Sequence, residues 1–180
     1  MDKIKISFVL NGKPVSVDIS PEMTLLTVLK EVLDINSVKR ACVGGECGAC
    51  TVIVDGKAMN SCLILAATLD GNCVETLESL GTPEHLHPLQ KAFYEMGASQ
   101  CGFCTPGFIM SAKALLDQNP DPTEEEIRIG LSGNLCRCTG YVKPVQAVQK
   151  AAAEMKASDA AVEAVRVAAQ RLHADGERGN

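Results

Sequence analysis

The spacing of its cysteines constrains this chain more than any other feature of the sequence. Cys42, Cys47 and Cys50 lie in one short loop with the spacing C-x4-C-x2-C, and eleven residues separate Cys50 from Cys62. A chain of 180 residues can bury about 70% of its unfolded surface and needs no covalent staples. Its nine cysteines therefore indicate metal, redox or disulfide chemistry.

The first cysteine set, within residues 42–62, differs in spacing from common zinc sites. Structural zinc loops usually supply their ligands as two C-x2-C pairs. Here three cysteines come from one loop, which is the plant-type spacing for a 2Fe-2S cluster. Gly44, Gly45 and Gly48 let the backbone wrap closely around sulfur and turn its N–H groups toward it. We therefore predict a 2Fe-2S cluster, with zinc and then disulfides as the alternatives. The predicted ligands are Cys42, Cys47, Cys50 and Cys62.

A second cysteine set combines Cys101-Gly-Phe-Cys104 with Cys136-Arg-Cys138. In an extended C-x-C segment the two side chains point to the same side, so both sulfurs can reach one iron, whereas a disulfide between them would be strained. A thioredoxin-like dithiol would need a βαβ context, and the surrounding pattern is helical instead. A helix predicted to start directly after Cys104 offers N–H groups and a dipole that favour anionic sulfur. This set predicts a second 2Fe-2S cluster, with zinc as the alternative.

The first half of the chain has the period of β-strands. Residues 3–9 and 14–19 alternate polar and apolar side chains around Asn11-Gly12, which is a two-residue hairpin signal. Asp55-Gly56 predicts a second hairpin that ends near Cys62, and a last strand is expected over residues 73–77. Between the hairpins, an apolar stripe predicts a helix from Pro21 to about Leu33. This pattern predicts an α+β domain over residues 1–78.

Beyond residue 78 the apolar period changes to that of helices. Helices are predicted over residues 88–95, ended by Gly97, and over residues 106–118. Thr123 and Glu126 form a capping box for a helix to about Leu131, and a last helix is predicted to begin near Pro144. We place a boundary at residues 78–84 and predict a helical domain over residues 84–157.

The tail, residues 158–180, continues an apolar repeat in steps of three and four. One long helix, or two helices joined at Ser158-Asp159, would explain this repeat. We favour an amphipathic helix that packs on its own domain over a helix that binds a partner. We expect the final residues, 174–180, to be disordered. The repeat consists of Val148, Ala151, Met155, Val162, Val165, Ala169 and Leu172.

Composition and local pattern exclude several classes of function. The net charge of −5 and the pI near 5.2 argue against nucleic-acid binding. The longest apolar stretch, residues 63–67, is far shorter than the roughly 18 residues needed to cross a bilayer. No signal-peptide pattern is present, so we expect a cytoplasmic protein without membrane insertion. Nothing resembles a nucleophile, a catalytic triad or a phosphate loop, so we expect no catalytic residues on this chain.

Three further candidates are interpreted as structural residues. Cys73 lies in an expected strand, and because free cysteine is among the most buried residue types, we predict that it belongs to the core. His85 and His87 could suggest a Rieske-type ligand pair. Eight better-placed cysteines already fill two clusters, so we expect these histidines in a loop and at a helix start.

Three motifs together resemble one known family. They are CVGGECGACTV over residues 42–52, QCGFCTPG over residues 100–107 and LCRCTGY over residues 135–141. In this order they are similar to the iron-sulfur subunit of the molybdenum hydroxylases, the family of xanthine dehydrogenase, aldehyde oxidoreductase and carbon monoxide dehydrogenase. The resemblance runs from about Ile4 to Val148, and Ala41 departs from it where many relatives have glycine. It implies a β-grasp, ferredoxin-like 2Fe-2S domain followed by an all-α, four-helix-bundle 2Fe-2S domain.

The resemblance also implies a function for the chain. Electrons would pass between a molybdopterin on a large subunit and a flavin, FAD, on a medium subunit, through the helical-domain cluster and then the sheet-domain cluster. Gln100 and Cys138 would lie at the pterin edge. The ligands of the helical-domain cluster would be Cys101, Cys104, Cys136 and Cys138. A free-standing ferredoxin with two clusters and a zinc-stabilised interaction module are the alternatives.

Overall fold

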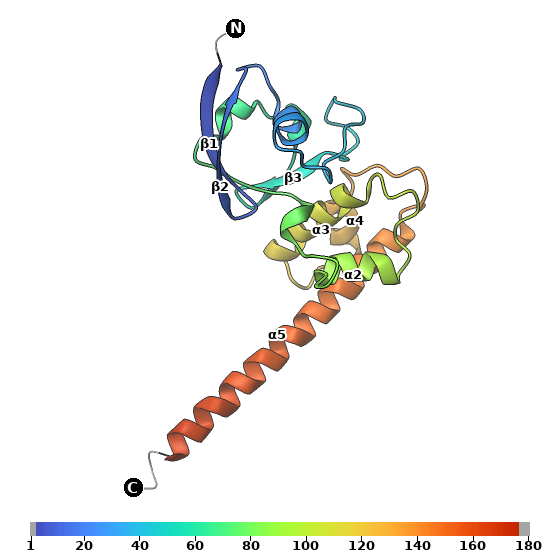
Figure 1. Cartoon of the computed structure of the whole chain (residues 1–180). Helices are drawn as coiled ribbons and strands as arrows, with labels where there is room; N and C mark the ends of the chain where they lie inside the picture. The colour runs from blue at the N-terminus through green and yellow to red at the C-terminus, as the bar shows by residue number, and fades with distance from the viewer. Residues whose placement is uncertain (1–2, 177–180) are drawn as a thin grey trace.

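The computed structural model describes residues 3–176 of the chain. A mixed β-sheet forms the N-terminal part, helices form the C-terminal part, and one long helix extends away from both (Figure 1). Each part has its own core of buried apolar side chains. A mixed-sheet domain followed by a helical region agrees with the predicted fold class at this level.

The sheet contains five strands in the order β2-β1-β5-β3-β4. β1 (Ile4–Leu10) pairs antiparallel with β2 (Lys13–Ile19), and β3 (Thr51–Val54) pairs antiparallel with β4 (Lys57–Asn60). β5 (Cys73–Glu75) joins the two hairpins and runs parallel to β1 and antiparallel to β3. Both predicted hairpins are confirmed. The last strand is shorter than predicted, because the chain turns into a 3-10 helix directly after it.

Left-handed backbone conformations close both hairpins. Asn11 and Gly12 have φ angles of 51° and 76°, and Asp55 and Gly56 have φ angles of 46° and 77°. Positive φ at both central residues is the signature of two-residue turns whose twist matches that of the strands. The second hairpin leads into a 3-10 helix, η2, which carries Cys62 into the core of the sheet domain. The 3-10 helices are η2 (Ser61–Leu63), η3 (Ala66–Leu69) and η4 (Leu77–Ser79).

A short helix packs on the sheet, where α1 (Leu25–Thr27) continues as a π-helical turn, η1 (Val28–Val32). The predicted start at Pro21 is wrong. The N–H of Leu25 donates to the carbonyl oxygen of Ile64 at 2.8 Å, so this pairing with a distant segment holds the preceding residues out of the helix. The predicted apolar stripe is buried nonetheless. Its fully buried members, at most 1% exposed, are Leu25, Leu26, Val28 and Leu29.

The helical region contains α2 (Pro88–Glu95), α3 (Thr105–Gln118), α4 (Glu124–Gly130) and α5 (Val142–Gly176). The predicted capping box at the start of α4 is present. Gly97, with a φ of 60°, follows α2 as predicted, and α5 begins at Val142, slightly before the predicted Pro144. His87 caps α2, and His85 lies in the turn before it, as expected. The four-helix bundle stays a prediction, because α5 extends far beyond the helices on which it packs.

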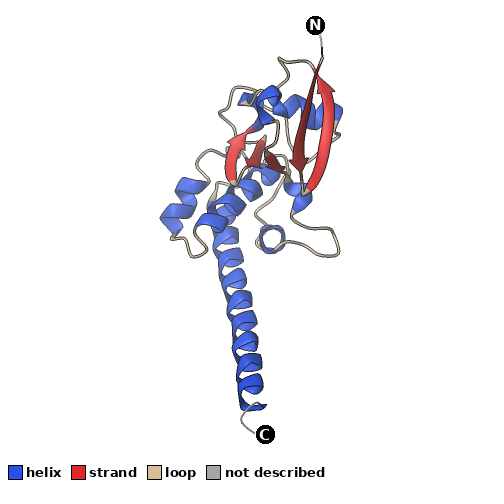
Figure 2. Cartoon of the chain, turned by 90° about the vertical axis from the view of Figure 1, so that its left-hand side faces the viewer, coloured by secondary structure: helices blue, strands red, loops and turns tan. Residues whose placement is uncertain are grey.

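α5 is one continuous helix of 35 residues, which excludes the alternative of two helices joined at Ser158-Asp159. Val148 and Ala151, in its N-terminal part, are fully buried in the helical core. Lys156 Nζ lies 2.6 Å from Asp121 Oδ2, and beyond this ion pair the helix runs away from both domains in both views (Figure 1, Figure 2). The prediction that the tail packs on its own domain is therefore wrong.

The last residues of α5 also differ from expectation. Residues 174–176 belong to the helix, although they were predicted to be disordered, and residues 177–180 lie outside the described part of the chain. Within residues 3–176, none of the helices combines the length and the apolar character needed to cross a membrane. The division of the chain into residues 1–78, 84–157 and 158–180 stays a prediction.

Candidate iron-sulfur sites

The first cysteine set lies in the loop between η1 and β3, with its last member in η2. Cys50 and Cys62 are 3% and 5% exposed, so the sheet domain shields both sulfurs from water. Cys47 is half-buried and Cys42 is exposed. The set thus extends from the core of the domain to its surface.

Glycine is required at two positions of this loop. Gly45 and Gly48 have φ angles of 82° and 67°, a left-handed conformation that other residues adopt at a cost of about 1–2 kcal/mol. A Cβ at Gly45 would lie 2.4 Å from Leu63 Cδ1, and one at Gly48 would lie 2.3 Å from the carbonyl oxygen of Gly133. The loop therefore packs tightly against η2 on one side and against the helical region on the other.

The thiols of the first set interact in two pairs. The pKa of Cys42 is lowered to about 6, first by the N–H of Gly44, which lies 3.4 Å from Cys42 Sγ, and then by the N–H and thiol groups of Cys47. Burial raises the pKa of Cys62 to about 11, and the neighbouring thiol of Cys50 contributes to this rise. The pairs are therefore Cys42 with Cys47 and Cys50 with Cys62.

The second cysteine set comes from two segments that only the fold brings together. Cys101 and Cys104 directly precede α3, whereas Cys136 and Cys138 lie between α4 and α5. Cys101 Sγ and Cys138 Sγ are 3.8 Å apart. Burial raises the pKa of Cys104 to about 12, and the adjacent thiol of Cys136 is the next cause. This set also forms two pairs, Cys101 with Cys138 and Cys104 with Cys136.

Thiols arranged as two pairs suit a binuclear cluster better than a single ion. Four cysteines bind the two irons of a 2Fe-2S cluster, so each iron can take one pair. A structural zinc ion needs four ligands that converge on one point at about 2.3 Å. The residues present therefore fit two 2Fe-2S clusters.

Cys136 is surrounded by hydrogen-bond donors. Thr139 Oγ1 lies 3.1 Å from Cys136 Sγ, and the N–H groups of Cys138 and Thr139 each lie 3.4 Å from it. Burial raises the pKa of Cys136, but the hydroxyl of Thr139 and these N–H groups together lower it to about 7. The Tyr141 hydroxyl accepts a hydrogen bond from the N–H of Cys136 at 3.0 Å. Sequence reasoning missed Thr139 and Tyr141, although a hydroxyl directly after the C-x-C motif was an available signal.

Hydrogen bonds join the two cysteine sets directly. The N–H of Leu135 donates to the carbonyl oxygen of Cys47 at 2.9 Å. Asn134, which is 2% exposed, donates from Nδ2 to the carbonyl oxygen of Gly48 at 3.0 Å and to Thr51 Oγ1 at 3.3 Å. Sequence reasoning missed Asn134, because no local pattern shows that this amide is buried against a loop from the other domain.

Apolar contacts and a third close glycine complete the joint between the domains. Ile53 of β3 packs with Met110 and Ala114 of α3, and Figure 1 shows these two elements next to each other. A Cβ at Gly107 would lie 2.3 Å from the carbonyl oxygen of Gly48. The first turn of α3 therefore lies directly against the loop of the first cysteine set.

The two residues predicted for the pterin edge lie at the surface, and so does Cys73. Gln100 is exposed in the loop between α2 and α3, next to the exposed Cys101, and Cys138 is exposed as well. The prediction that Cys73 belongs to the core is wrong, because Cys73 is exposed at the start of β5. Side chains alternate between the two faces of a strand, and Val74, at 1% exposure, occupies the buried face instead.

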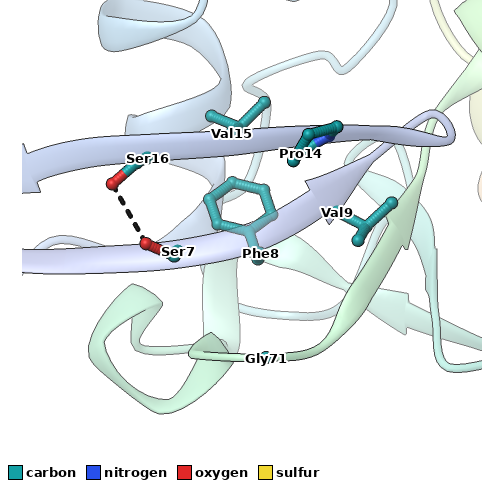
Figure 3. Close-up of a pocket in the computed structure, with 7 residues that line it drawn as sticks. All are labelled: Ser7, Phe8, Val9, Pro14, Val15, Ser16 and Gly71. Carbon is teal, nitrogen blue, oxygen red and sulfur yellow. Dashed lines mark hydrogen bonds between the residues drawn. The ribbon is translucent and has the colours of Figure 1, made fainter.

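A hollow on the β1–β2 hairpin lies apart from both cysteine sets (Figure 3). The rings of Phe8 and Pro14 and the hydroxyls of Ser7 and Ser16, which are 3.0 Å apart, line it. None of its lining residues is titratable or a common metal ligand. The hollow therefore offers no chemistry comparable to that of the cysteine sets.

Two thiol sets on two joined domains define a protein that carries two 2Fe-2S clusters. Two family models agree with this class. One, described as a 2Fe-2S iron-sulfur cluster binding domain, matches residues 8–74. The other, described as a 2Fe-2S binding domain, matches residues 76–149.

Known relatives identify the family. The nicotinate dehydrogenase small FeS subunit of Eubacterium barkeri is 50% identical over 84% of this chain and 96% of that subunit. The xanthine dehydrogenase iron-sulfur-binding subunit of Escherichia coli O157:H7 is 46% identical over 82% of this chain and 93% of that subunit. The crystal structure of the aldehyde oxidoreductase from Desulfovibrio desulfuricans ATCC 27774 matches with a TM-score of 0.84 and 46% identity, over 87% of this chain and 17% of that one. The chain belongs to the family of iron-sulfur subunits of the molybdenum hydroxylases, and it is an oxidoreductase subunit.

Proposed function

We propose that this chain relays electrons between a molybdopterin on a large subunit and an FAD on a medium subunit of a molybdenum hydroxylase. The observation that carries the proposal is the joint between the two cysteine sets, where the N–H of Leu135 donates to the carbonyl oxygen of Cys47 at 2.9 Å. Two one-electron sites fixed against each other in one chain form a route for electrons. Membership of the family supports the same conclusion.

In this proposal each cysteine set holds one cluster, which accepts and releases one electron when bound. The chain's own residues position the sulfurs, shield Cys50 and Cys62 from water, and direct hydrogen bonds at Cys42 and Cys136. The sheet domain is a β-grasp domain, and α2 to α5 form the four-helix domain. The ligands of the first cluster are Cys42, Cys47, Cys50 and Cys62. The ligands of the second cluster are Cys101, Cys104, Cys136 and Cys138.

Exposed cysteines supply the two ends of the route. Cys101 and Cys138 are exposed in the helical domain, and Cys42 is exposed in the sheet domain. The second cluster then faces the molybdopterin, with Gln100 and Cys138 at the pterin edge, and the first cluster faces the FAD. The length of the aldehyde oxidoreductase supports a large partner, because this chain covers only 17% of it.

The partner chain, and not this one, would select the substrate. The relatives described above are named for nicotinate, xanthine and aldehydes, yet they share this unit. A unit common to enzymes with such different substrates transfers electrons and leaves specificity to another site.

Purification from the native host tests the proposal. We expect a tagged chain to co-purify with a molybdenum-bearing chain and a flavin-bearing chain. It should contain about four irons per chain and give two distinguishable EPR signals after reduction. One cluster, or none, would contradict the proposal. Two clusters without either partner would favour the free-standing ferredoxin, and zinc without sulfide would favour the interaction module.

A further inference from the structure

We propose that Thr139 raises the reduction potential of the second cluster by donating its hydroxyl hydrogen bond to Cys136 Sγ. This inference rests on the proposed function, in which Cys136 binds iron. Thr139 is not itself a ligand in that arrangement. It acts through Cys136 and is therefore a positioning residue.

The hydrogen-bond geometry directs the Thr139 hydroxyl at sulfur. Thr139 Oγ1 lies 3.1 Å from Cys136 Sγ and accepts a hydrogen bond from the N–H of Tyr141 at 3.3 Å. Since the oxygen accepts from Tyr141, its own hydrogen is available for the sulfur. A hydrogen bond to an anionic acceptor is stronger than one between neutral groups, and linked hydrogen bonds polarise one another. The thiolate of Cys136 therefore receives a strengthened donor.

A strained turn holds this donor in place. Gly140 and Tyr141 both have left-handed φ angles, 65° and 68°, and this conformation costs a residue with a Cβ about 1–2 kcal/mol. Two contacts stabilise Tyr141 in spite of the strain. Its hydroxyl accepts from the N–H of Cys136 at 3.0 Å, and its ring centroid lies 6.3 Å from that of Phe108. The turn thus folds back on Cys136 and fixes the distance between the Thr139 hydroxyl and the sulfur.

The position of the hydroxyl determines the direction of its effect. One-electron reduction adds one negative charge to a 2Fe-2S cluster and its thiolates, and no bond or proton has to move. A hydrogen bond to sulfur stabilises this added charge, which makes reduction more favourable. Within residues 3–176, no threonine or serine hydroxyl donates to a sulfur of the first set, where the N–H of Gly44 donates to Cys42 instead. Removal of the Thr139 hydroxyl should therefore alter one potential and leave the other unchanged.

Two substitutions of Thr139 separate the effect of the hydroxyl on the potential from the effect of the side-chain shape. Thr139→Val keeps the shape and removes the donor, whereas Thr139→Ser keeps the donor. Thr105→Val is a matched control, because the Thr105 hydroxyl donates to Ser99 Oγ at 2.9 Å and not to a sulfur. Each full-length protein, loaded with both clusters, is titrated anaerobically with a chemical reductant while EPR follows the two signals separately.

We expect Thr139→Val to shift the midpoint potential of the second cluster to a more negative value and to leave that of the first cluster unchanged. Thr139→Ser should restore a potential close to that of the natural protein, and Thr105→Val should change neither. An unchanged or more positive second potential in Thr139→Val, with both signals present, would overturn the inference. Absence of one signal from the natural protein would instead contradict the proposed function.

A measurement on the natural protein covers the case in which Thr139→Val does not assemble its cluster. Hydroxyl protons exchange with solvent during mixing, so brief transfer to D2O should place a deuteron beside Cys136 Sγ. Pulsed EPR of the reduced second cluster should then detect, immediately after transfer, a deuteron coupling that precedes those from the more slowly exchanging N–H groups of Cys138 and Thr139, which lie 3.4 Å from the same sulfur. Absence of this coupling after exchange would overturn the inference.

Discussion

The two cysteine sets hold their sulfurs in place by different means. The first set comes from one continuous loop and one hairpin, with glycines and backbone N–H groups around the sulfurs. The second set comes from two segments separated by 31 residues, and a side-chain hydroxyl and a strained turn position Cys136. The first arrangement is encoded locally, whereas the second exists only when the helices have packed. The two clusters should therefore respond differently to substitution.

Replacement of one proposed ligand in each set is expected to have the largest effect and tests this difference most directly. Cys138→Ser should disturb the second cluster, impair coupling to the molybdenum site and leave the first cluster intact, so that iron falls from about four to about two per chain. Cys62→Ser should disturb the first cluster and leave the second cluster intact. Iron analysis and EPR of each variant provide the measurement. Loss of both signals from Cys138→Ser would show that the sets do not assemble independently.

Gly48→Ala tests the tight packing between the sets. The new Cβ would lie 2.3 Å from the carbonyl oxygen of Gly133, on a residue with a φ of 67°. We expect a loss of about 3 kcal/mol or more in the free energy of unfolding, because the strain of a left-handed residue is added to a backbone clash. Gly56→Ala is the matched control, since Gly56 has a φ of 77° with open space around it, and about 1 kcal/mol is expected there. Equal losses in the free energy of unfolding for Gly48→Ala and Gly56→Ala, measured by denaturant unfolding, would contradict a backbone clash at Gly48.

Asn134→Ala removes the buried amide that bridges the domains. The hydroxyl of Thr51 would lose the amide donor, and the carbonyl oxygen of Gly48 would keep only the N–H and the hydroxyl of Thr51 as donors. We expect a loss of about 2 kcal/mol in the free energy of unfolding. The magnetic interaction between the two reduced clusters should also change in EPR. Asn36 is the control, because it is exposed and its side-chain amide donates to Asp34; Asn36→Ala should lower the free energy of unfolding by less than about 0.5 kcal/mol. Equal effects of the two variants would show that the joint does not depend on Asn134.

Glu78→Gln should have the smallest effect, and it should depend on pH. Burial raises the pKa of Glu78, but hydrogen bonds from Ser37, just before the first loop, and from Thr76 lower it below its usual 4.5. A carboxylate with a lowered folded pKa contributes stability above its usual pKa and loses this contribution as the pH falls through the folded value. We expect Glu78→Gln to cost about 1 kcal/mol at pH 7, since solvent exposure limits the effect.

Denaturant unfolding at several pH values provides the measurement for Glu78→Gln. The difference in the free energy of unfolding between Glu78→Gln and the natural protein should be largest at pH 7. It should decline below about pH 4.5, the usual pKa of this carboxyl. Glu22→Gln, at an exposed residue, is the control. A difference that does not change with pH would contradict a role for the Glu78 carboxylate.

Much of the fold follows from short-range signals. Asn11-Gly12 and Asp55-Gly56 predict both hairpins because the turn conformation depends on those residues alone, and Thr123 with Glu126 predicts the start of α4 for the same reason. The start of α1 could not be predicted, because the pairing of Leu25 with Ile64 comes from tertiary structure. The apolar repeat in α5 shows which residues share a face, but not whether another element covers that face.

The candidate sites were likewise predicted only where the signal lies in the local sequence. The spacing of the cysteines predicts both sets, since ligand geometry requires particular separations along the chain. The pairing of thiols, the buried amide of Asn134 and the contact between Thr139 and Cys136 involve distances that no spacing rule contains. The exposure of Cys73 could not be predicted either, because residue type alone does not tell which face of β5 packs inward.

The long C-terminal helix has a consequence for the hydrodynamics of the chain. Its 35 residues span about 52 Å at 1.5 Å per residue, whereas a compact domain of about 150 residues has a radius of gyration near 15 Å. A particle of this shape experiences more friction in solution than a sphere of equal mass. On a gel-filtration column calibrated with globular standards, a monomer of 19.1 kDa will therefore elute early and resemble a larger species. Light scattering, which measures mass independently of shape, is the appropriate method for counting its subunits.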